Sequence, residues 1–225
     1  MAVESGKLAP PGDSPDTTRA SRAYADLRAQ ILAGDYEPNS RLTETELSAR
    51  LEISRGTLRS VLARLAQEGY VTAEANRSAR TRSFSEEEAV EILETREVLE
   101  AALAAKAAER ATEEDIAALT ETCERMRAGR ESDGRDESSA HNRRFHELVR
   151  AMARQATLTR FVDSLLYPMV LRQFRDMERP RSRDTILHEH EAILAAIITH
   201  NPDAAAAAMR HHLSAVRRAL QLGPA

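Results

Sequence analysis

The chain has 225 residues, enough to bury an apolar core, and its one cysteine, Cys123, excludes a disulfide framework or a multi-cysteine metal site within one chain. No apolar run, the segment 193–199 included, is long enough to span a bilayer, which takes roughly 20 residues. We therefore expect a protein without membrane contact, located in a reducing cytoplasm.

The formal net charge of −4 argues, as a single number, against a nucleic-acid partner. The charge is unevenly distributed, however: residues 19–84 contain 11 Arg and 8 acidic residues, whereas residues 85–225 contain 20 basic and 25 acidic residues. Arg accounts for 30 of the 32 basic residues, and its guanidinium is the better group for phosphate and guanine. The imbalance indicates two domains of different chemistry with a boundary near Ser85.

Residues 1–18 are predicted to form a disordered tail. They contain Pro10, Pro11 and Pro15 among small polar residues, and they lack the apolar segment of a signal peptide.

Residues 19–84 contain three helical patterns followed by a hairpin. Tyr24, Leu27 and Ile31 recur at helical spacing, and the pattern stops at residue 34, a glycine. A second helix should start at the capping box 43–46, and a third should be N-capped by Ser54 and end near residue 69. With a hairpin over residues 70–84, this arrangement is a winged helix-turn-helix.

Beyond Ser85, which starts another capping box, the sequence is dominated by Ala, Leu, Glu and Arg with helical periodicity. Six helices are predicted, over residues 86–110, 113–128, 137–153, 156–177, 182–199 and 202–220. Pro168 should kink the fourth helix. Strand signals are absent from this part of the sequence, so the predicted fold class is mostly α: a winged helix-turn-helix followed by an all-helical antiparallel bundle.

The N-terminal end of the third helix has the composition of a segment that enters the major groove. No acidic residue occurs in residues 53–67, and Arg55 and Arg59 share a face opposite the buried leucines. Hydroxyl groups at a helix N-terminus suit phosphate, and the hairpin tip is also basic. The candidate DNA-contacting residues are Ser54, Arg55, Thr57, Arg59, Arg77 and Arg80. The alternative is that these arginines only solvate a helical face.

Three histidines occupy inward positions of three different helices. His190 and His212 each lie on an apolar stripe, and His146 follows Asn142 by four residues, so that these two lie side by side. His188 lies about 200° round the helix from His190 and should face elsewhere. The three inward imidazoles could converge as metal ligands; the alternative is three separate core or surface histidines.

Several motifs in the first 84 residues resemble the GntR family of bacterial transcription regulators. They are Ile31–Gly34, Arg41–Glu44, Glu46–Ala49, Ser54–Arg59 and Leu65–Gly69. The resemblance implies that Arg55, Thr57, Arg59 and the wing read DNA. The chain departs from the family at Thr45, where many members carry a DNA-contacting Arg, and at Asn76, where the wing usually has Gly.

The C-terminal part resembles the FCD ligand domain of the FadR subfamily. The motifs are Asn142–His146, Glu189–Ile193 and Met209–Leu213. The resemblance implies an effector-binding and dimerisation domain over residues 85–221, in which a divalent metal (Zn, Ni or Mn) in turn holds a small organic acid. The implied metal ligands, which also belong to the effector site, are Asn142, His146, His190 and His212.

The same resemblance implies that Arg96 points into the effector pocket and pairs with a carboxylate. The alternative for Arg96 is a surface i,i+4 pair with Glu100. Asn142 stands where an Asp is commoner, so the implied site carries one negative charge less.

These observations predict a homodimeric transcription regulator that binds a double-stranded DNA operator and is not an enzyme. We expect it to act as a repressor. A metal-dependent hydrolase is one alternative, because three histidines can activate water, but the zinc-protease pattern fails at Ala192. A helical interaction protein is the other, and it would leave the arginines near Ser54 unexplained.

Overall fold

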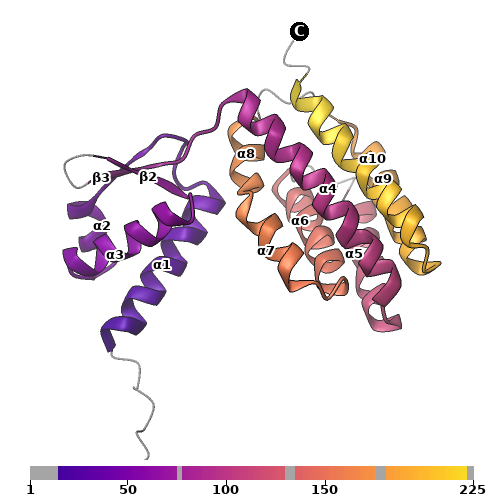
Figure 1. The fold of residues 1–225 in the computed structure, drawn as a ribbon, viewed down its shortest axis with the longest axis horizontal. Coiled ribbons are helices and arrows are strands. Elements are labelled where there is room, and N and C mark those ends of the chain that lie inside the picture. Colours follow the sequence, from indigo (N-terminus) through magenta and orange to yellow (C-terminus); the bar gives the residue numbers. More distant parts are fainter. Residues whose placement is uncertain (1–14, 75–77, 130–134, 176–180, 222–225) are drawn as a thin grey trace, which may run out of the picture. The chain divides into compact units, whose positions relative to one another are not determined.

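The computed structural model describes residues 15–74, 78–129, 135–175 and 181–221, and it divides into two compact units, Met1–Ser83 and Phe84–Ala225 (Figure 1). The predicted fold class is confirmed: unit 1 combines helices with a small sheet, and the described residues of unit 2 form helices without a strand. Within these ranges, no helix combines the length and the apolar character needed to cross a membrane.

The described residues of unit 1 contain three helices, α1 (Pro15–Ala33), α2 (Glu44–Arg50) and α3 (Arg55–Gln67). Its antiparallel sheet has the order β1-β3-β2 and consists of β1 (Arg41–Thr43), β2 (Val71–Glu74) and β3 (Ser78–Thr81). The predicted hairpin is therefore present as β2 and β3. The sequence missed β1, because three residues with one buried side chain, Leu42, are too few to show an alternating pattern.

The start of α3 is capped as predicted. The Ser54 Oγ accepts a hydrogen bond from the Thr57 N–H at 3.0 Å. Leu58, Leu62 and Leu65 are buried along one face of α3, which packs against α1. This apolar face leaves the opposite side of α3, with its arginines, at the surface.

The start of α2 differs from its prediction. The Thr43 side chain makes no capping hydrogen bond; its Oγ1 donates instead to Glu46 Oε2 at 3.3 Å. Thr43 is the last residue of β1, and its backbone follows the sheet. The helix starts where predicted, but the capping box does not form.

The predicted tail over residues 1–18 is too long, because α1 already begins at Pro15. Proline has its φ pre-set for the first helical position, so the sequence is compatible with a helix that starts there. Residues 1–14 lie outside the described part of the chain.

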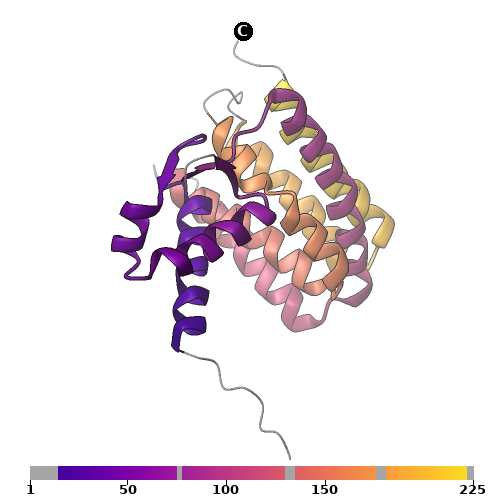
Figure 2. The same cartoon turned by 60° about the vertical axis from the view of Figure 1, so that its left-hand side comes forward.

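The helices of unit 2 surround α4. They are α4 (Glu86–Arg110), α5 (Glu113–Ala128), α6 (Arg135–Met152), α7 (Ala156–Ser164), α8 (Tyr167–Gln173), α9 (Arg183–Ile198) and α10 (Pro202–Gln221). α4 packs against α6, α7, α8, α9 and α10, and Figures 1 and 2 show α10 running along its length. Ala101, Ala104, Ala107 and Ala108 of α4 are buried, and these small side chains let the neighbouring helices approach closely.

The predicted helix 156–177 is in fact two helices, and the predicted kink at Pro168 is wrong. α7 ends at Ser164, and Leu166 takes the left-handed conformation with φ 55° before α8 begins. Pro168 lies in the first turn of α8. N–H groups in the first turn have no intrahelical acceptor, so the missing N–H of proline costs no hydrogen bond there. The proline therefore starts a new helix instead of bending an existing one.

The Cys123 thiol on α5 should be inert in the folded protein. Its side chain is 2% exposed, and burial raises the pKa of the thiol to about 12. Because the thiolate is the reactive species, a disulfide reagent such as DTNB should label the native protein far more slowly than the unfolded protein in guanidinium, which should release one equivalent per chain. Equal labelling rates in the two states would contradict this placement of Cys123.

Candidate effector site and nucleic-acid interface

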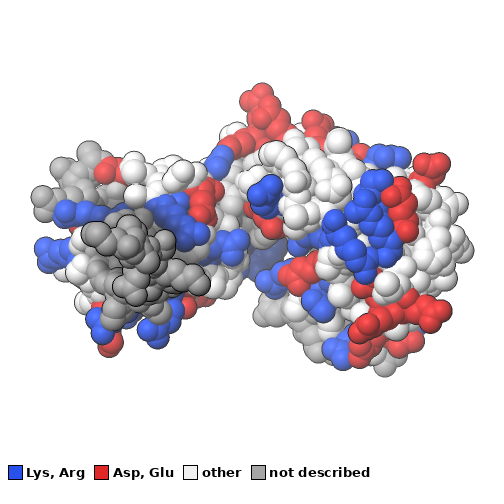
Figure 3. All heavy atoms as spheres, turned by 60° about the horizontal axis from the view of Figure 1, so that its bottom comes forward, with Lys and Arg blue, Asp and Glu red and all other residues white. Residues whose placement is uncertain are grey.

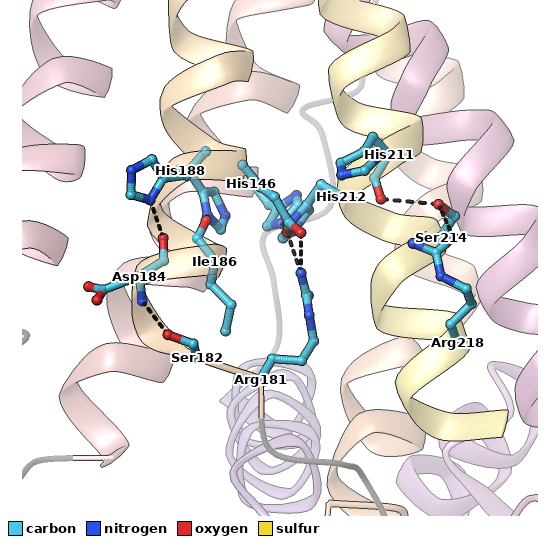
Figure 4. Close-up of polar contacts among 12 residues, drawn as sticks. His146, Arg181, Ser182, Asp184, Ile186, His188, His211, His212, Ser214 and Arg218 are labelled. Carbon is cyan, nitrogen blue, oxygen red and sulfur yellow. Dashed lines mark hydrogen bonds and ion pairs between the residues drawn. The ribbon is translucent and has the colours of Figure 1, made fainter. Parts of the chain in front are cut away.

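Three helices of unit 2 bring His146 (α6), His190 (α9) and His212 (α10) together in the interior; we call these three residues the His cluster. Their exposed fractions are 1%, 0% and 3%, and their ligand nitrogens lie within 4.8 Å of one another. His188 points away from the cluster, as its helical position predicted: it is exposed, and its Nδ1 lies 2.6 Å from the Asp184 carbonyl oxygen (Figure 4).

The surroundings of the His cluster determine which ring nitrogens carry protons. Each Nδ1 faces an oxygen that, as an ionised carboxylate or a backbone carbonyl, can only accept, so each Nδ1 must donate. Each Nε2 is then left with a lone pair and no proton. The three contacts are His146 Nδ1 to Glu100 Oε2 at 2.6 Å, His212 Nδ1 to Glu189 Oε2 at 2.7 Å, and His190 Nδ1 to the Ile186 carbonyl oxygen at 2.7 Å.

The three Nε2 atoms meet without a hydrogen-bond donor between them. The Nε2 atoms of His146 and His212 are 3.2 Å apart, and the buried Nε2 of His190 has no hydrogen-bond partner. Burial lowers the pKa of His146 and of His212 to about 4, and that of His190 to about 3, so all three rings are neutral near neutral pH. Converging imidazole lone pairs are a donor set that fits a divalent transition metal.

A buried arginine, Arg96, and a half-buried one, Arg181, hold the carboxylates that orient the histidines. Arg96 Nε donates to Glu100 Oε1 at 2.7 Å. Arg181 Nη2 donates to both carboxylate oxygens of Glu189, as the dashed lines from Arg181 in Figure 4 show. Burial by itself raises the pKa of Glu100, but Arg96 and His146 together outweigh it and hold this pKa well below its usual range. Two Arg–Glu–His chains therefore end at the same group of nitrogens.

Arg96 forms the i,i+4 pair with Glu100 that the sequence offered as an alternative, but the pair lies in the interior and not at the surface. The exposed fractions of the two side chains are 3% and 1%. The guanidinium carbon of Arg96 lies 3.8 Å from the centroid of the Tyr167 ring, and Arg150 Nη1 lies 3.9 Å from Glu100 Oε1. Arg96 is thus a buried cation beside the His cluster.

Asn142 lies one turn before His146 on α6 and is half-buried. This position keeps it on the same side of the helix as His146. Its role as a fourth ligand stays a prediction.

Sequence reasoning missed most of the residues that surround the His cluster. The sequence pattern does not indicate Arg181, Arg150 or Tyr167. It includes Glu189 only as the first residue of a motif, and it indicates Glu100 only as a partner for Arg96. One signal was available for Glu100: it shares an apolar stripe with Leu103, and a buried carboxylate requires a partner. No comparable signal links residues on different helices, such as Glu189 and His212.

In unit 1, most of the predicted DNA-contacting residues lie at the N-terminus of α3. Arg55 is exposed in the first turn, and the hydroxyl oxygens of Ser54 and Thr57 are 2.8 Å apart. Arg59 Nε is 3.0 Å from each carboxylate oxygen of Glu44, and its side chain is 48% exposed. Glu44, a largely buried residue that the sequence did not indicate, holds Arg59 in place while leaving it accessible.

The wing is described only in part. Arg80 on β3 donates through Nε to Glu74 at 2.5 Å and through Nη1 to the Asn39 carbonyl oxygen at 2.9 Å, so its guanidinium also serves to join β-strands and loop. Arg77 and Asn76 lie outside the described residues. Figure 3 shows further basic side chains spread over unit 1.

The fold and the two sites define a class of protein: a winged helix-turn-helix DNA-binding unit joined to a helical ligand-binding unit. Residues 19–80 match the model of the bacterial regulatory proteins of the gntR family, and residues 91–215 match the FCD domain. The chain belongs to the GntR family of transcription regulators and carries a C-terminal FCD domain. The family predicted from the motifs is thereby confirmed.

Similar proteins are transcription regulators as well. The HTH-type transcriptional repressor GlaR of Escherichia coli (strain K12) is 26% identical over 198 residues, 84% of this chain and 90% of that protein. The Nta operon transcriptional regulator of Aminobacter aminovorans is 37% identical over 84 residues, 37% of this chain and 40% of that protein. The solved structure of E. coli McbR/YncC has the same fold, with a TM-score of 0.78, 20% identity, and coverage of 91% and 97% of the two chains. A regulator, and not an enzyme, is the class these comparisons support.

Metal binding should depend on the inward histidine of α9 and not on its exposed neighbour. Titration of the metal-stripped protein with Ni²⁺ or Zn²⁺ in a calorimeter should give one site per chain, and His190→Ala should weaken it by roughly 100-fold or more, because a direct ligand is lost. His188→Ala is the matched control and should bind as the wild type does. Equal losses in both variants would show that the metal binds elsewhere.

Proposed function

We propose that this transcription regulator works in the cytoplasm as a homodimer, binds a double-stranded operator through the N-terminus of α3 and the wing, and is controlled by a small organic acid at the His cluster. The observation that carries the control step is the meeting of three unprotonated Nε2 atoms in the interior of unit 2. A buried arrangement of this kind is poorly satisfied until a cation enters it.

The charges around the His cluster favour an anionic effector. The charged groups around the cluster, which are buried or half-buried, contain one more cation than anion even before a metal ion is added: they are Arg96, Arg150, Arg181, Glu100 and Glu189. A divalent metal adds two further positive charges, and an excess of this size in a buried site requires a compensating anion. A carboxylate meets this need and can accept hydrogen bonds from a guanidinium in a bidentate manner.

The residues of the site would divide the work. His146, His190 and His212 would hold the metal, Asn142 is the proposed fourth ligand, and the metal when bound would supply a positive charge that attracts the effector carboxylate. Glu100 and Glu189 hold two of the rings in the ligating tautomer. Arg96 lies where it can exchange part of its contact with Glu100 for a contact with the effector.

The DNA-binding end uses the exposed side of α3. We assign base or phosphate contacts to Arg55 and Arg59, and phosphate contacts to the hydroxyls of Ser54 and Thr57 at the positive helix terminus. Arg77 and Arg80 are assigned to the wing. Repression is the proposed sense, because GlaR, to which most of the chain is similar, is a repressor. Control requires that the effector bind the two operator-affinity states of the regulator unequally.

Operator binding should depend on the arginines of α3. An Arg55→Ala, Arg59→Ala double variant should bind the DNA upstream of its own gene about 10-fold or more weakly in fluorescence anisotropy, since each arginine contact contributes to specific affinity. Arg125→Ala, which removes an exposed arginine of α5, is the control and should bind normally. Wild-type affinity in the double variant would contradict the assignment of α3 as the reading helix.

The effector class can be tested without knowing the effector. In a thermal-shift screen of Ni²⁺-loaded protein against small mono- and dicarboxylates, at least one acid should raise the melting temperature and change the operator affinity about 5-fold or more. The uncharged amide analogue of that acid should do neither, because it lacks the compensating charge. If the acid stabilises His190→Ala equally, its site is not the His cluster.

A further inference from the structure

We infer that α8 is the element that transmits occupancy of the His cluster to the point where the chain passes into the DNA-binding unit. Tyr167, its first residue, contacts the surroundings of the cluster, and Gln173, its last residue, holds the connecting backbone at Phe84. The regulatory meaning of this inference rests on the proposed function, whereas the mechanical connection rests on the contacts alone.

The first residue of α8 is connected to a cluster histidine by a path of three contacts, through Arg96 and Glu100. The Tyr167 ring lies against the guanidinium of Arg96 at 3.8 Å, and its Oη accepts a hydrogen bond from Arg150 Nη1 at 3.3 Å. Both arginines face Glu100, at 2.7 Å and 3.9 Å, and Glu100 accepts the hydrogen bond of His146. A change in the position or the pairing of Arg96 therefore acts directly on the residue that begins α8.

The second end of α8 binds both backbone polar groups of one residue. Gln173 Oε1 accepts from the Phe84 N–H at 2.9 Å, and Gln173 Nε2 donates to the Phe84 carbonyl oxygen at 2.6 Å. Phe84 is the first residue of unit 2, and it stands between Ser83, the last residue of unit 1, and Ser85, the N-cap of α4. A paired contact of this kind fixes both the position and the orientation of the connecting peptide.

Helix α8 is short, and it is separated from the preceding helix, α7. Its seven residues span about 10 Å at the usual helical rise, and Met169 and Val170 anchor it in the interior. The left-handed residue Leu166 interrupts the hydrogen bonding between α7 and α8. A short helix that is broken from its neighbour can shift or rotate as a unit, as helices do by roughly 1–2 Å in switching proteins.

These contacts give α8 a role that simple packing does not require. An anion and a cation arriving at the cluster change what Arg96 can pair with, and the Tyr167 ring must adjust to the new position of the guanidinium. Because the helix is rigid, a displacement of Tyr167 also displaces Gln173, and this changes the contact of Gln173 with the Phe84 backbone. A purely structural Gln173 would stabilise the connection without making it respond to the cluster.

The test follows the amide hydrogen of Phe84 by hydrogen–deuterium exchange of the full-length protein, with and without saturating Ni²⁺. In the wild type, Ni²⁺ should change the exchange rate of this amide about 3-fold or more, since the paired hydrogen bonds between Gln173 and the Phe84 backbone become tighter or looser. In Gln173→Ala the amide should exchange faster and no longer respond, while Ni²⁺ affinity stays within about 2-fold of wild type. Gln155→Ala, at the start of α7, is the matched control and should respond as the wild type does. A Ni²⁺ response that persists in Gln173→Ala overturns the inference.

A second arm needs no metal and separates this inference from the proposed function. Tyr167→Leu removes the contacts with Arg96 and Arg150 at the N-terminal end of α8. It should raise the exchange rate of the Phe84 amide about 3-fold or more. Phe161→Ala, at an exposed position of α7, should leave it unchanged. If Ni²⁺ fails to bind, the proposed metal site is wrong, but the Tyr167→Leu variant still tests whether α8 connects Arg96 with Phe84. An unchanged exchange rate of the Phe84 amide in Tyr167→Leu overturns the inference about α8.

Discussion

The candidate site of unit 2 depends on a group of buried imidazole nitrogens that carry lone pairs and no protons. The arrangement exists because Glu100 and Glu189 each accept from a ring Nδ1, which leaves the Nε2 atoms facing inward. Unpaired carboxylates in the interior would be costly; Glu100 is paired with the buried Arg96, and Glu189 with the half-buried Arg181. The positions of α4, α6, α9 and α10 are thus tied together by one polar network.

Such a network contributes little to the stability of the fold, but it fixes the positions of the side chains in it. Taking two charges out of water costs several kcal/mol per ion, and mutual attraction often does no more than repay it. What the Arg–Glu pairs do provide is a defined ring orientation and a defined tautomer at the His cluster. The same chemistry appears on a smaller scale in unit 1, where the carboxylate of Glu44 orients Arg59 near the start of α3.

The two units of the chain have opposite electrostatic tasks. In the proposed function, the exposed arginines of unit 1 meet a polyanion, whereas the small positive excess in the interior of unit 2 binds a single organic anion. Helix α8 relates the two tasks, because its first residue contacts the cations of the buried site and its last residue holds the peptide that leads to unit 1. The net charge of −4 averages over both tasks and describes neither.

The sequence by itself determined the class of fold, the capped recognition helix and the inward direction of the three histidines. These features follow from local rules, since a 3.6-residue period shows which face of a helix is buried and a Ser at the right place caps it. Only the tertiary structure decided which buried faces meet: that His212 finds Glu189, that Gln173 binds Phe84 across 89 residues, and that the helix predicted to bend at Pro168 is broken at Leu166. Contacts of this kind depend on the packing of whole helices around α4, and no periodicity along one helix records its partner on another.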